Sequence, residues 1–251
     1  MNSAHKNMPD ILFEDNHLLA INKRAGDLSQ PDSSGEPFLQ SIIADFLKIR
    51  DSKPGNVYIG TLHRLDRPVS GVLLFAKTSK AAGRVADLIR SRKFHKFYLA
   101  ITPLSSFQDN EWIHLKDSLI RDEDFTRIAS PDENGTQASL HVRTLSHGRH
   151  YSLSLIRLDT GRKHQIRAQL SSRDMPILGD VKYGSTVKID KGIALHACFL
   201  NFEHPVKKEP VIISAPIPEY LKEIIINDGM TFPDAETISR ECLSFLKNIG
   251  H

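Results

Sequence analysis

The pattern of hydrophobic and polar positions predicts strands and one helix in the first part of the chain. Two short apolar runs flank a polar turn, which is typical of a β-hairpin. Ser33 and Glu36 form a capping-box pattern ahead of apolar residues that recur every three or four positions, so a helix is expected to follow. The predicted elements are a hairpin of residues 11–13 and 18–21, a helix that ends near Ile49, and a short strand at residues 57–59.

The rest of the chain alternates between amphipathic helices and strands. A continuous apolar run over residues 72–76 predicts a buried strand, and Ser79 is in position to cap the helix that follows. From Phe94 the pattern has period two, so Lys96 and Tyr98 are expected to share one face of a strand. Three later period-two segments predict an antiparallel meander. The elements expected after the buried strand are a helix that follows Ser79 and includes Arg90, strands at 94–101, 111–120, 137–145, 150–158, 193–202 and 211–214, and helices at 163–170, 218–226 and 235–249.

The composition is that of a globular protein from a reducing compartment. With 251 residues and 40% hydrophobic content, the chain can bury a substantial core, as one large domain or two intimately packed lobes. Cys198 and Cys242 are its two thiols, so no disulfide framework is predicted and a cytoplasmic location is expected. Residues 1–9 are polar and no apolar run approaches the ~20 residues of a membrane span, so neither targeting nor anchoring is predicted.

Positive charge is concentrated in two blocks of the sequence. Residues 61–100 hold nine Lys and Arg against two Asp and Glu, and residues 141–190 hold nine against four. Because the whole chain has a net charge of only +3, the other 161 residues sum to −9. Two basic blocks are expected if they converge on a polyanion, and two solvated helix faces are the alternative.

Residues 63–71, His-Arg-Leu-Asp-Arg-Pro-Val-Ser-Gly, form the most distinctive segment. Asp66 stands between Arg64 and Arg67, and Gly71 precedes an apolar run, which predicts a turn followed by a buried strand. The two cations favour the ionised form of the acid. In isolation, however, such a turn is usually a surface salt bridge, so the charges alone do not identify a catalytic group.

Motifs for several other chemistries are missing from the sequence. Twelve histidines are scattered, and neither HExxH nor CxxC occurs, so no metal site is predicted. His63, His164 and His196 are therefore expected to make structural hydrogen bonds. GxGxxG and GxxxxGK[ST] are also absent, which argues against a dinucleotide or ATP site, and Ser70 lacks the G-x-S-x-G elbow of a nucleophilic serine.

The remaining features suit chemistry on a nucleotide. An aspartate that an arginine keeps ionised can attack a sugar or base carbon, or can remove a proton. A tyrosine ring can stack on an extruded base while basic segments hold the flanking phosphates. Ordinary glycosidases use two carboxylates, and no second acid stands out in this sequence.

The segment of residues 63–71 closely resembles the signature of the RluA-type RNA pseudouridine synthases. Five further segments resemble this family in the expected order, and together they cover roughly residues 11–216. Accidental matching of so many ordered motifs is improbable, unlike a match to any one of them. The further segments are residues 21–26, 96–100, 158–167, 176–184 and 194–197.

The resemblance implies an α+β fold with a mixed, mainly antiparallel central sheet flanked by helices. It also implies that Asp66 is the catalytic aspartate, that the ring of Tyr98 packs on the target base, and that Arg167 pairs with the Asp66 carboxylate. Arg64 matches the position associated with opening the RNA as the uridine is flipped out. The residues implied to contact RNA are Arg64, Arg67, Lys96, Arg162, Lys163, His164 and Gln165.

The implied reaction isomerises a uridine in ribosomal or transfer RNA. The enzyme breaks the N1–C1′ bond, turns the uracil and rejoins it through C5. No cofactor or metal is implied, because the base is both leaving group and incoming nucleophile. Three roles stay open for Asp66, namely attack on C1′, addition to C6 or removal of the 2′ proton. Two rival functions are a non-catalytic RNA-binding protein that retains the fold and a hydrolytic nucleosidase.

Three residues depart from the family pattern, and the domain limits follow from the same resemblance. Val69 stands where threonine is usual, Arg24 where proline is usual, and Gln169 where histidine often occurs. Val69 removes a hydroxyl near Asp66. Only about ten residues precede the first strand, so no N-terminal S4-type module is expected. A monomer is the simpler expectation. The predicted parts are a tail of residues 1–10, a catalytic domain of residues 11–226 and a helical extension of residues 227–251.

Overall fold

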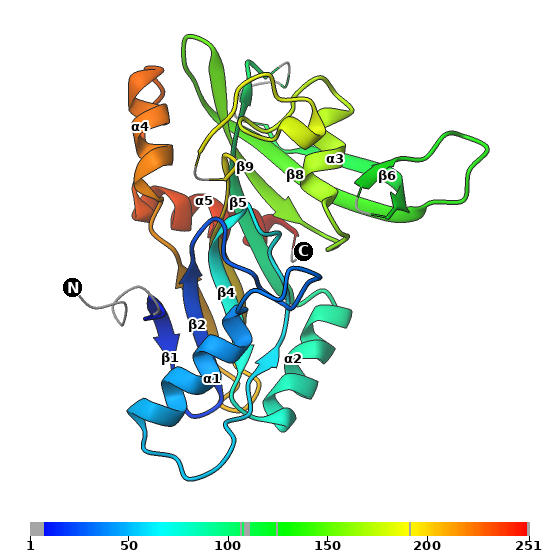
Figure 1. The fold of residues 1–251 in the computed structure, drawn as a ribbon. Coiled ribbons are helices and arrows are strands. Elements are labelled where there is room, and N and C mark those ends of the chain that lie inside the picture. The colour runs from blue at the N-terminus through cyan, green and yellow to red at the C-terminus, as the bar shows by residue number, and fades with distance from the viewer. Residues whose placement is uncertain (1–7, 106, 108–110, 124, 191, 250–251) are drawn as a thin grey trace. The chain divides into compact units, whose positions relative to one another are not determined.

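The structure is a computed structural model that describes residues 8–105, 107, 111–123, 125–190 and 192–249. Most of the predicted N-terminal tail, residues 1–7, lies outside the described residues. The fold class is α+β, with five α-helices among the described residues and a mixed, mostly antiparallel sheet, as expected (Figure 1). The chain divides into two compact units, Met1–Phe94 with Leu200–Pro216 and His95–Phe199 with Ile217–His251.

The first unit contains a strand array in the order β1-β2-β4-β10, with β3 on β4 and β11 on β10. The predicted hairpin is confirmed, because β1 and β2 pair in antiparallel fashion, and β2 pairs with β4 in the same way. Strand β10 contributes residues to both units. The elements are β1 (Ile11–Glu14), β2 (Leu18–Lys23), α1 (Leu39–Arg50), β3 (Gly60–Thr61), β4 (Ser70–Ala76), α2 (Ser79–Arg90), β10 (Leu195–Glu203) and β11 (Pro210–Ser214).

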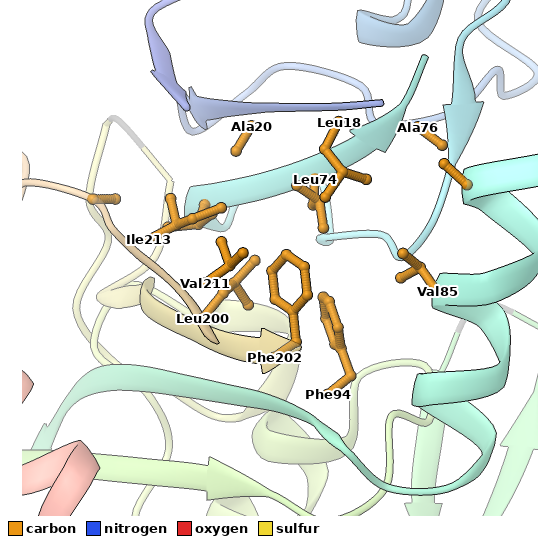
Figure 2. Packing of buried hydrophobic residues seen from close by; sticks show 13 residues of the cluster. Leu18, Ala20, Leu74, Ala76, Val85, Phe94, Leu200, Phe202, Val211 and Ile213 are labelled. Carbon is orange, nitrogen blue, oxygen red and sulfur yellow. The ribbon is translucent and has the colours of Figure 1, made fainter. Parts of the chain in front are cut away.

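A buried apolar cluster holds the first unit together. Figure 2 shows the ring of Phe94 beside that of Phe202, with Val85 of α2 and Leu74 of β4 nearby. The two ring centroids are 5.0 Å apart. Every residue of β4 is buried, which agrees with the continuous apolar run that predicted this strand. The cluster therefore fixes the strand that follows the Asp66 turn.

Two predicted helix caps in the first unit are wrong. Helix α1 begins at Leu39 without a side-chain cap, because Ser34 and its neighbours form a separate turn. The carboxylate of Asp32 accepts a hydrogen bond from Ser34 N (2.8 Å), and Ser34 Oγ accepts one from Glu36 N (3.2 Å). Helix α2 forms where a helix was predicted, but its cap is Thr78 rather than Ser79.

The short strand predicted at residues 57–59 is also displaced. Strand β3 instead comprises Gly60–Thr61. The side chain of Gln40 explains part of the difference, because its Nε2 donates a hydrogen bond to the carbonyl oxygen of Ile59 (2.6 Å). That carbonyl bonds to a helix side chain rather than to a neighbouring strand.

The second unit contains strands in the order β10-β5-β9-β8-β6-β7. The predicted antiparallel meander is confirmed by the pairing of β6 with β8 and of β8 with β9. Strand β7 was not predicted, and it forms a hairpin with β6. The elements are β5 (Phe94–Pro103), β6 (Ile113–Asp122), β7 (Phe125–Ile128), β8 (Thr136–His147), β9 (Tyr151–Leu158), α3 (Gln165–Ser171), the 3-10 helix η2 (Val181–Tyr183), α4 (Glu219–Asn227) and α5 (Ala235–Ile249).

Strand register gives the sheet of the second unit two chemically different faces. Tyr98 of β5 lies opposite Ile156 of β9, and Lys96 lies opposite Leu158. The intervening residue, Phe97, therefore points to the other face. Helix α3 packs on the face of Tyr98, where Ala168 joins a buried cluster with residues of β6 and β8. Phe245 of α5 packs on the opposite face, with its ring centroid 6.1 Å from that of Phe97.

Cysteine usage agrees with the sequence prediction. Cys198 and Cys242 are both buried free thiols. Burial raises the pKa of both thiols far above the ordinary range, so they stay protonated and unreactive at neutral pH. Across the described part of the chain, no helix is both long and apolar enough to span a bilayer.

The two faces of β11 provide a test of the buried cluster. Ile213 is 3% exposed and belongs to the cluster, whereas its neighbour Ile212 is 46% exposed. We expect Ile213→Ala to lower the free energy of unfolding by about 2–5 kcal/mol in urea denaturation. The matched variant Ile212→Ala is expected to change it by less than about 0.5 kcal/mol. Equal losses in the two variants would contradict the assignment of the core.

Candidate active site

Asp66 lies in a tight turn immediately before β4 in the first unit. The backbone N–H of Val69 donates a hydrogen bond to the carbonyl oxygen of Asp66 (3.0 Å), which closes the turn. The side chain of Asp66 is half-buried, whereas those of Arg64 and Arg67 are exposed. The predicted turn followed by a buried strand is confirmed.

The buried ammonium group of Lys23 fixes the backbone that follows Asp66. Lys23 is 1% exposed, and its Nζ donates hydrogen bonds to the carbonyl oxygens of Arg24 (3.0 Å), Arg67 (3.0 Å) and Val69 (2.7 Å). Burial lowers the pKa of Lys23 to about 8, against the attraction of nearby carboxylates. Lys23 is therefore mostly protonated at pH 7, and its ammonium group has one N–H donor for each of the three carbonyl acceptors.

Sequence reasoning missed Lys23 as a site residue. It assigned residues 21–26 only to a strand and loop of the family pattern. The available signal was a charged residue at the end of a strand whose other members are almost all buried. A lysine in such a position must find hydrogen-bond acceptors, and only the folded chain reveals that two of them follow Asp66.

Arg67 and His63 also organise the turn rather than standing free. Arg67 forms a bidentate pair with Glu36 (2.9 and 2.8 Å), and its Nε donates to the carbonyl oxygen of Gly26 (3.1 Å). Both side chains of this pair are well exposed, so the pair adds little stability. His63 Nε2 accepts a hydrogen bond from Leu74 N (3.1 Å), as expected for a structural histidine.

Tyr98 and Lys96 share one face of β5 in the second unit. Tyr98 is 5% exposed and Lys96 is half-buried. Burial lowers the pKa of Lys96 to about 8. Among the described residues the Lys96 ammonium has no hydrogen-bond or ion-pair partner. A Cβ atom at Gly161 would lie 3.0 Å from Lys96 Nζ, so this glycine leaves space for the ammonium group.

Arg167 is held rigidly within the second unit. It is 4% exposed in α3, and it forms a bidentate pair with Asp180, with Nε···Oδ2 at 2.6 Å and Nη2···Oδ1 at 2.8 Å. The guanidinium carbon also lies 4.6 Å from the ring centroid of Tyr183, which is a cation–π contact. The predicted pairing of Arg167 with Asp66 of the first unit stays a prediction, and the sequence did not reveal the role of Asp180.

Tyr183 links the arginine helix to the neighbouring hairpin. Its hydroxyl accepts a hydrogen bond from Thr126 N (2.9 Å) and lies 2.9 Å from His164 Nδ1. The ring of Phe125 stacks on that of Tyr183, with centroids 4.6 Å apart. Burial raises the pKa of Tyr183, so the hydroxyl keeps its proton at neutral pH. His164 thus makes the structural contact that was expected of it.

Two basic residues precede α3, and a residue with a buried amide side chain begins it. Arg162 is exposed and Lys163 is half-exposed, which leaves both accessible to a polyanion. Gln165 is buried instead, and its Oε1 accepts hydrogen bonds from Thr160 Oγ1 (2.8 Å) and Arg162 N (3.1 Å). Its Nε2 donates to the carbonyl oxygen of Ser139 (3.0 Å). This geometry favours a structural role for Gln165 over the RNA contact that the motif implied.

The three departures from the family pattern have identifiable surroundings. Val69 is buried, and its contact with Lys23 comes from its backbone carbonyl, which any residue would supply. Arg24 is exposed and likewise contributes its carbonyl. Gln169 is fully buried and donates from Nε2 to Asp117 Oδ2 (2.6 Å). Arg24 and Val69 therefore contact Lys23 through backbone atoms, and Gln169 contacts a residue of β6.

Comparison with models of protein families shows which family the chain belongs to. A model of the family described as RNA pseudouridylate synthase matches residues 17–172, which is more than half of the sequence. The chain belongs to the RNA pseudouridine synthase family. The family expectation drawn from the ordered motifs is thereby confirmed.

Individual members of this family resemble the chain over most of its length. Ribosomal large subunit pseudouridine synthase D of Xylella fastidiosa is 36% identical over 236 residues, covering 86% of this chain and 68% of the relative. tRNA pseudouridine synthase C of Haemophilus ducreyi is 32% identical over 247 residues, covering 90% and 98%. A solved structure titled Human RNA Pseudouridylate Synthase Domain Containing 4 superposes with a TM-score of 0.74 at 23% identity, covering 89% and 94%, and this likeness supports the fold.

The buried ion pair of this family member can be tested directly. Asp180→Asn would remove a buried carboxylate that pairs with the Arg167 guanidinium, so we expect the free energy of unfolding to fall by about 3–5 kcal/mol. The matched variant Asp174→Asn changes an exposed residue with a left-handed backbone, which asparagine tolerates. Its expected effect is below about 0.5 kcal/mol. Urea denaturation checks both values, and an unaffected Asp180→Asn variant would show that the pair is not structural.

Proposed function

We propose that the chain isomerises a specific uridine to pseudouridine in ribosomal or transfer RNA, with Asp66 as the catalytic residue. Membership of the pseudouridine synthase family supports the reaction, and two relatives carry names that state ribosomal and transfer RNA as their substrates. The proposal includes a cytoplasmic, monomeric enzyme that requires no cofactor.

The observation that carries the proposal is the fixed position of Asp66. Its turn is closed by its own backbone hydrogen bond, and Lys23 holds two carbonyl oxygens of the residues that follow it. A preorganised carboxylate can act on the sugar or base of a bound nucleotide without first being ordered, which lowers the entropic part of the barrier. Attack on C1′, addition to C6 and removal of the 2′ proton are all compatible with this arrangement.

Residues of the second unit supply the other functional groups in this proposal. The ring of Tyr98 packs on the target uracil, and stacking tolerates different neighbouring sequences. The Lys96 ammonium, on the same strand face, donates a hydrogen bond to a carbonyl oxygen of the base or to a phosphate. Asp180 orients Arg167, which pairs with the ionised Asp66 carboxylate.

Basic residues of both segments bind the RNA backbone in this proposal. Arg64 assists the opening of the RNA. Basic residues of the two blocks, residues 61–100 and 141–190, contact phosphates. Because each phosphate contact releases counterions, RNA affinity is expected to fall steeply with salt. The residues assigned to the RNA backbone are Arg64, Arg67, Arg162, Lys163 and His164.

Release of tritium from the C5 position of uridine tests the reaction and the residue together. Incubation with C5-tritiated ribosomal and transfer RNA is expected to release tritium without free uracil. Asp66→Asn is expected to lower the rate by at least about 1,000-fold, with RNA affinity within about twofold, because the amide cannot act as nucleophile or base. The control Asp87→Asn removes an exposed carboxylate of α2 and is expected to retain full activity.

The products distinguish the rival functions. Free uracil would indicate a hydrolytic nucleosidase, and RNA binding without either product would indicate a non-catalytic protein. Continued tritium release by Asp66→Asn would remove Asp66 from its assigned role while leaving the isomerase activity intact.

A further inference from the structure

A row of polar residues crosses the sheet of the second unit on the face opposite Tyr98. His114 of β6 lies directly opposite His141 of β8, and His141 lies directly opposite Arg157 of β9. The two imidazole rings stack with centroids 4.0 Å apart and an interplanar angle of 15°. Asp159, one residue beyond β9, brings its carboxylate to the same place. Nothing in the proposed uridine chemistry uses these residues.

The ligand atoms in this row have the spacing of a transition-metal site. Asp159 Oδ2 lies 3.2 Å from His114 Nε2 and 3.3 Å from His141 Nδ1. All three atoms lie within 4.8 Å of one another. Ligands at about 2.0–2.1 Å from a tetrahedral zinc ion are separated by about 3.4 Å. The two N···O separations match this spacing, and the stacked rings have to rotate before both imidazole lone pairs point at one ion.

One of the two histidine nitrogens has no hydrogen-bond partner within the described part of the chain. His141 Nδ1 is buried and makes no hydrogen bond within the described residues, because Asp159 Oδ2 lies outside hydrogen-bonding geometry despite its proximity. An imidazole nitrogen without a protein partner can offer its lone pair to a metal ion.

We propose that His114, His141 and Asp159 bind one zinc ion. Two imidazole nitrogens and one carboxylate oxygen form a donor set that suits zinc, and water completes the tetrahedron on the exposed side of His114. Arg157 pairs with the other carboxylate oxygen of Asp159, as the outer partner of a metal-binding carboxylate commonly does. Since Arg157 offsets the charge of Asp159, zinc binds more weakly here than in four-ligand structural sites.

The zinc ion would join strands that are distant in sequence. His114, His141 and Asp159 come from β6, from β8 and from the end of β9, and their spacing matches no linear metal motif. The ring of Phe245 in α5 contacts His141 edge-on, with centroids 5.1 Å apart. Metal binding therefore stabilises the second unit by fixing this strand row and the helix face that packs on it.

Calorimetric titration of the untagged, chelator-treated full chain with zinc chloride tests the site. We expect one equivalent of zinc to bind and to raise the melting temperature. His114→Gln and His141→Gln are each expected to lower zinc affinity by more than about tenfold and to abolish the thermal shift. The matched control His150→Gln alters a histidine that pairs with Asp228 elsewhere in the unit, and it is expected to bind zinc as the parent does.

Two results would overturn the zinc site. The first is an absence of saturable binding by the parent chain. The second is one-equivalent binding that survives in the folded double variant His114→Gln, His141→Gln, which would place zinc elsewhere. Circular dichroism verifies folding, and the half-exposed position of His114 makes its single variant informative even where His141→Gln is destabilised.

Discussion

The hydrogen bonds of one buried cation determine the shape of the Asp66 turn. Lys23 reaches three carbonyl oxygens, one in the residue after its own strand and two in the residues that follow the aspartate. Burying an ammonium group is costly, whereas each hydrogen bond from a charged donor contributes about 1.5–3 kcal/mol. The balance requires all three acceptors, so the loop after β2 and the turn before β4 must keep one arrangement. That requirement holds the Asp66 carboxylate in a fixed position.

Strand alternation places two sets of functional side chains on opposite faces of the sheet in the second unit. Lys96 and Tyr98 project from one face of β5, where α3 supplies Arg167 in its bidentate pair with Asp180. The opposite face carries the row that includes His114 and His141. Because successive side chains of a strand point in opposite directions, substitutions on one face leave the other face nearly unchanged.

Hydrophobic periodicity and turn residues predicted the elements that depend mainly on residues close together in the sequence. The hairpin of β1 and β2, helix α2 and the turn at Asp66 all follow from hydrophobic period and turn residues. The start of α1 was misplaced because Asp32 and Ser34 satisfy each other in a turn, which competes with the capping box. Strand β7 was missed because its four residues are stable only through pairing with β6 and contact with Tyr183.

Features that depend on distant residues were beyond prediction from the sequence. The family motifs included both Arg167 and Asp180, but nothing in their spacing showed that they pair. The cluster of His114, His141 and Asp159 depends on strand register, which a scan for metal motifs cannot detect. The role of Lys23 depends on acceptors that lie more than 40 residues away in sequence.

The most direct test of this account is the single-turnover rate of tritium release by Lys23→Met under saturating enzyme. If Lys23 acts by fixing the Asp66 turn, the rate falls by more than about tenfold while RNA affinity, measured by filter binding, stays within about twofold. Arg24→Met, which alters the exposed neighbour, keeps the parent rate. A folded Lys23→Met variant with the parent rate, or with a loss confined to RNA affinity, would contradict the account.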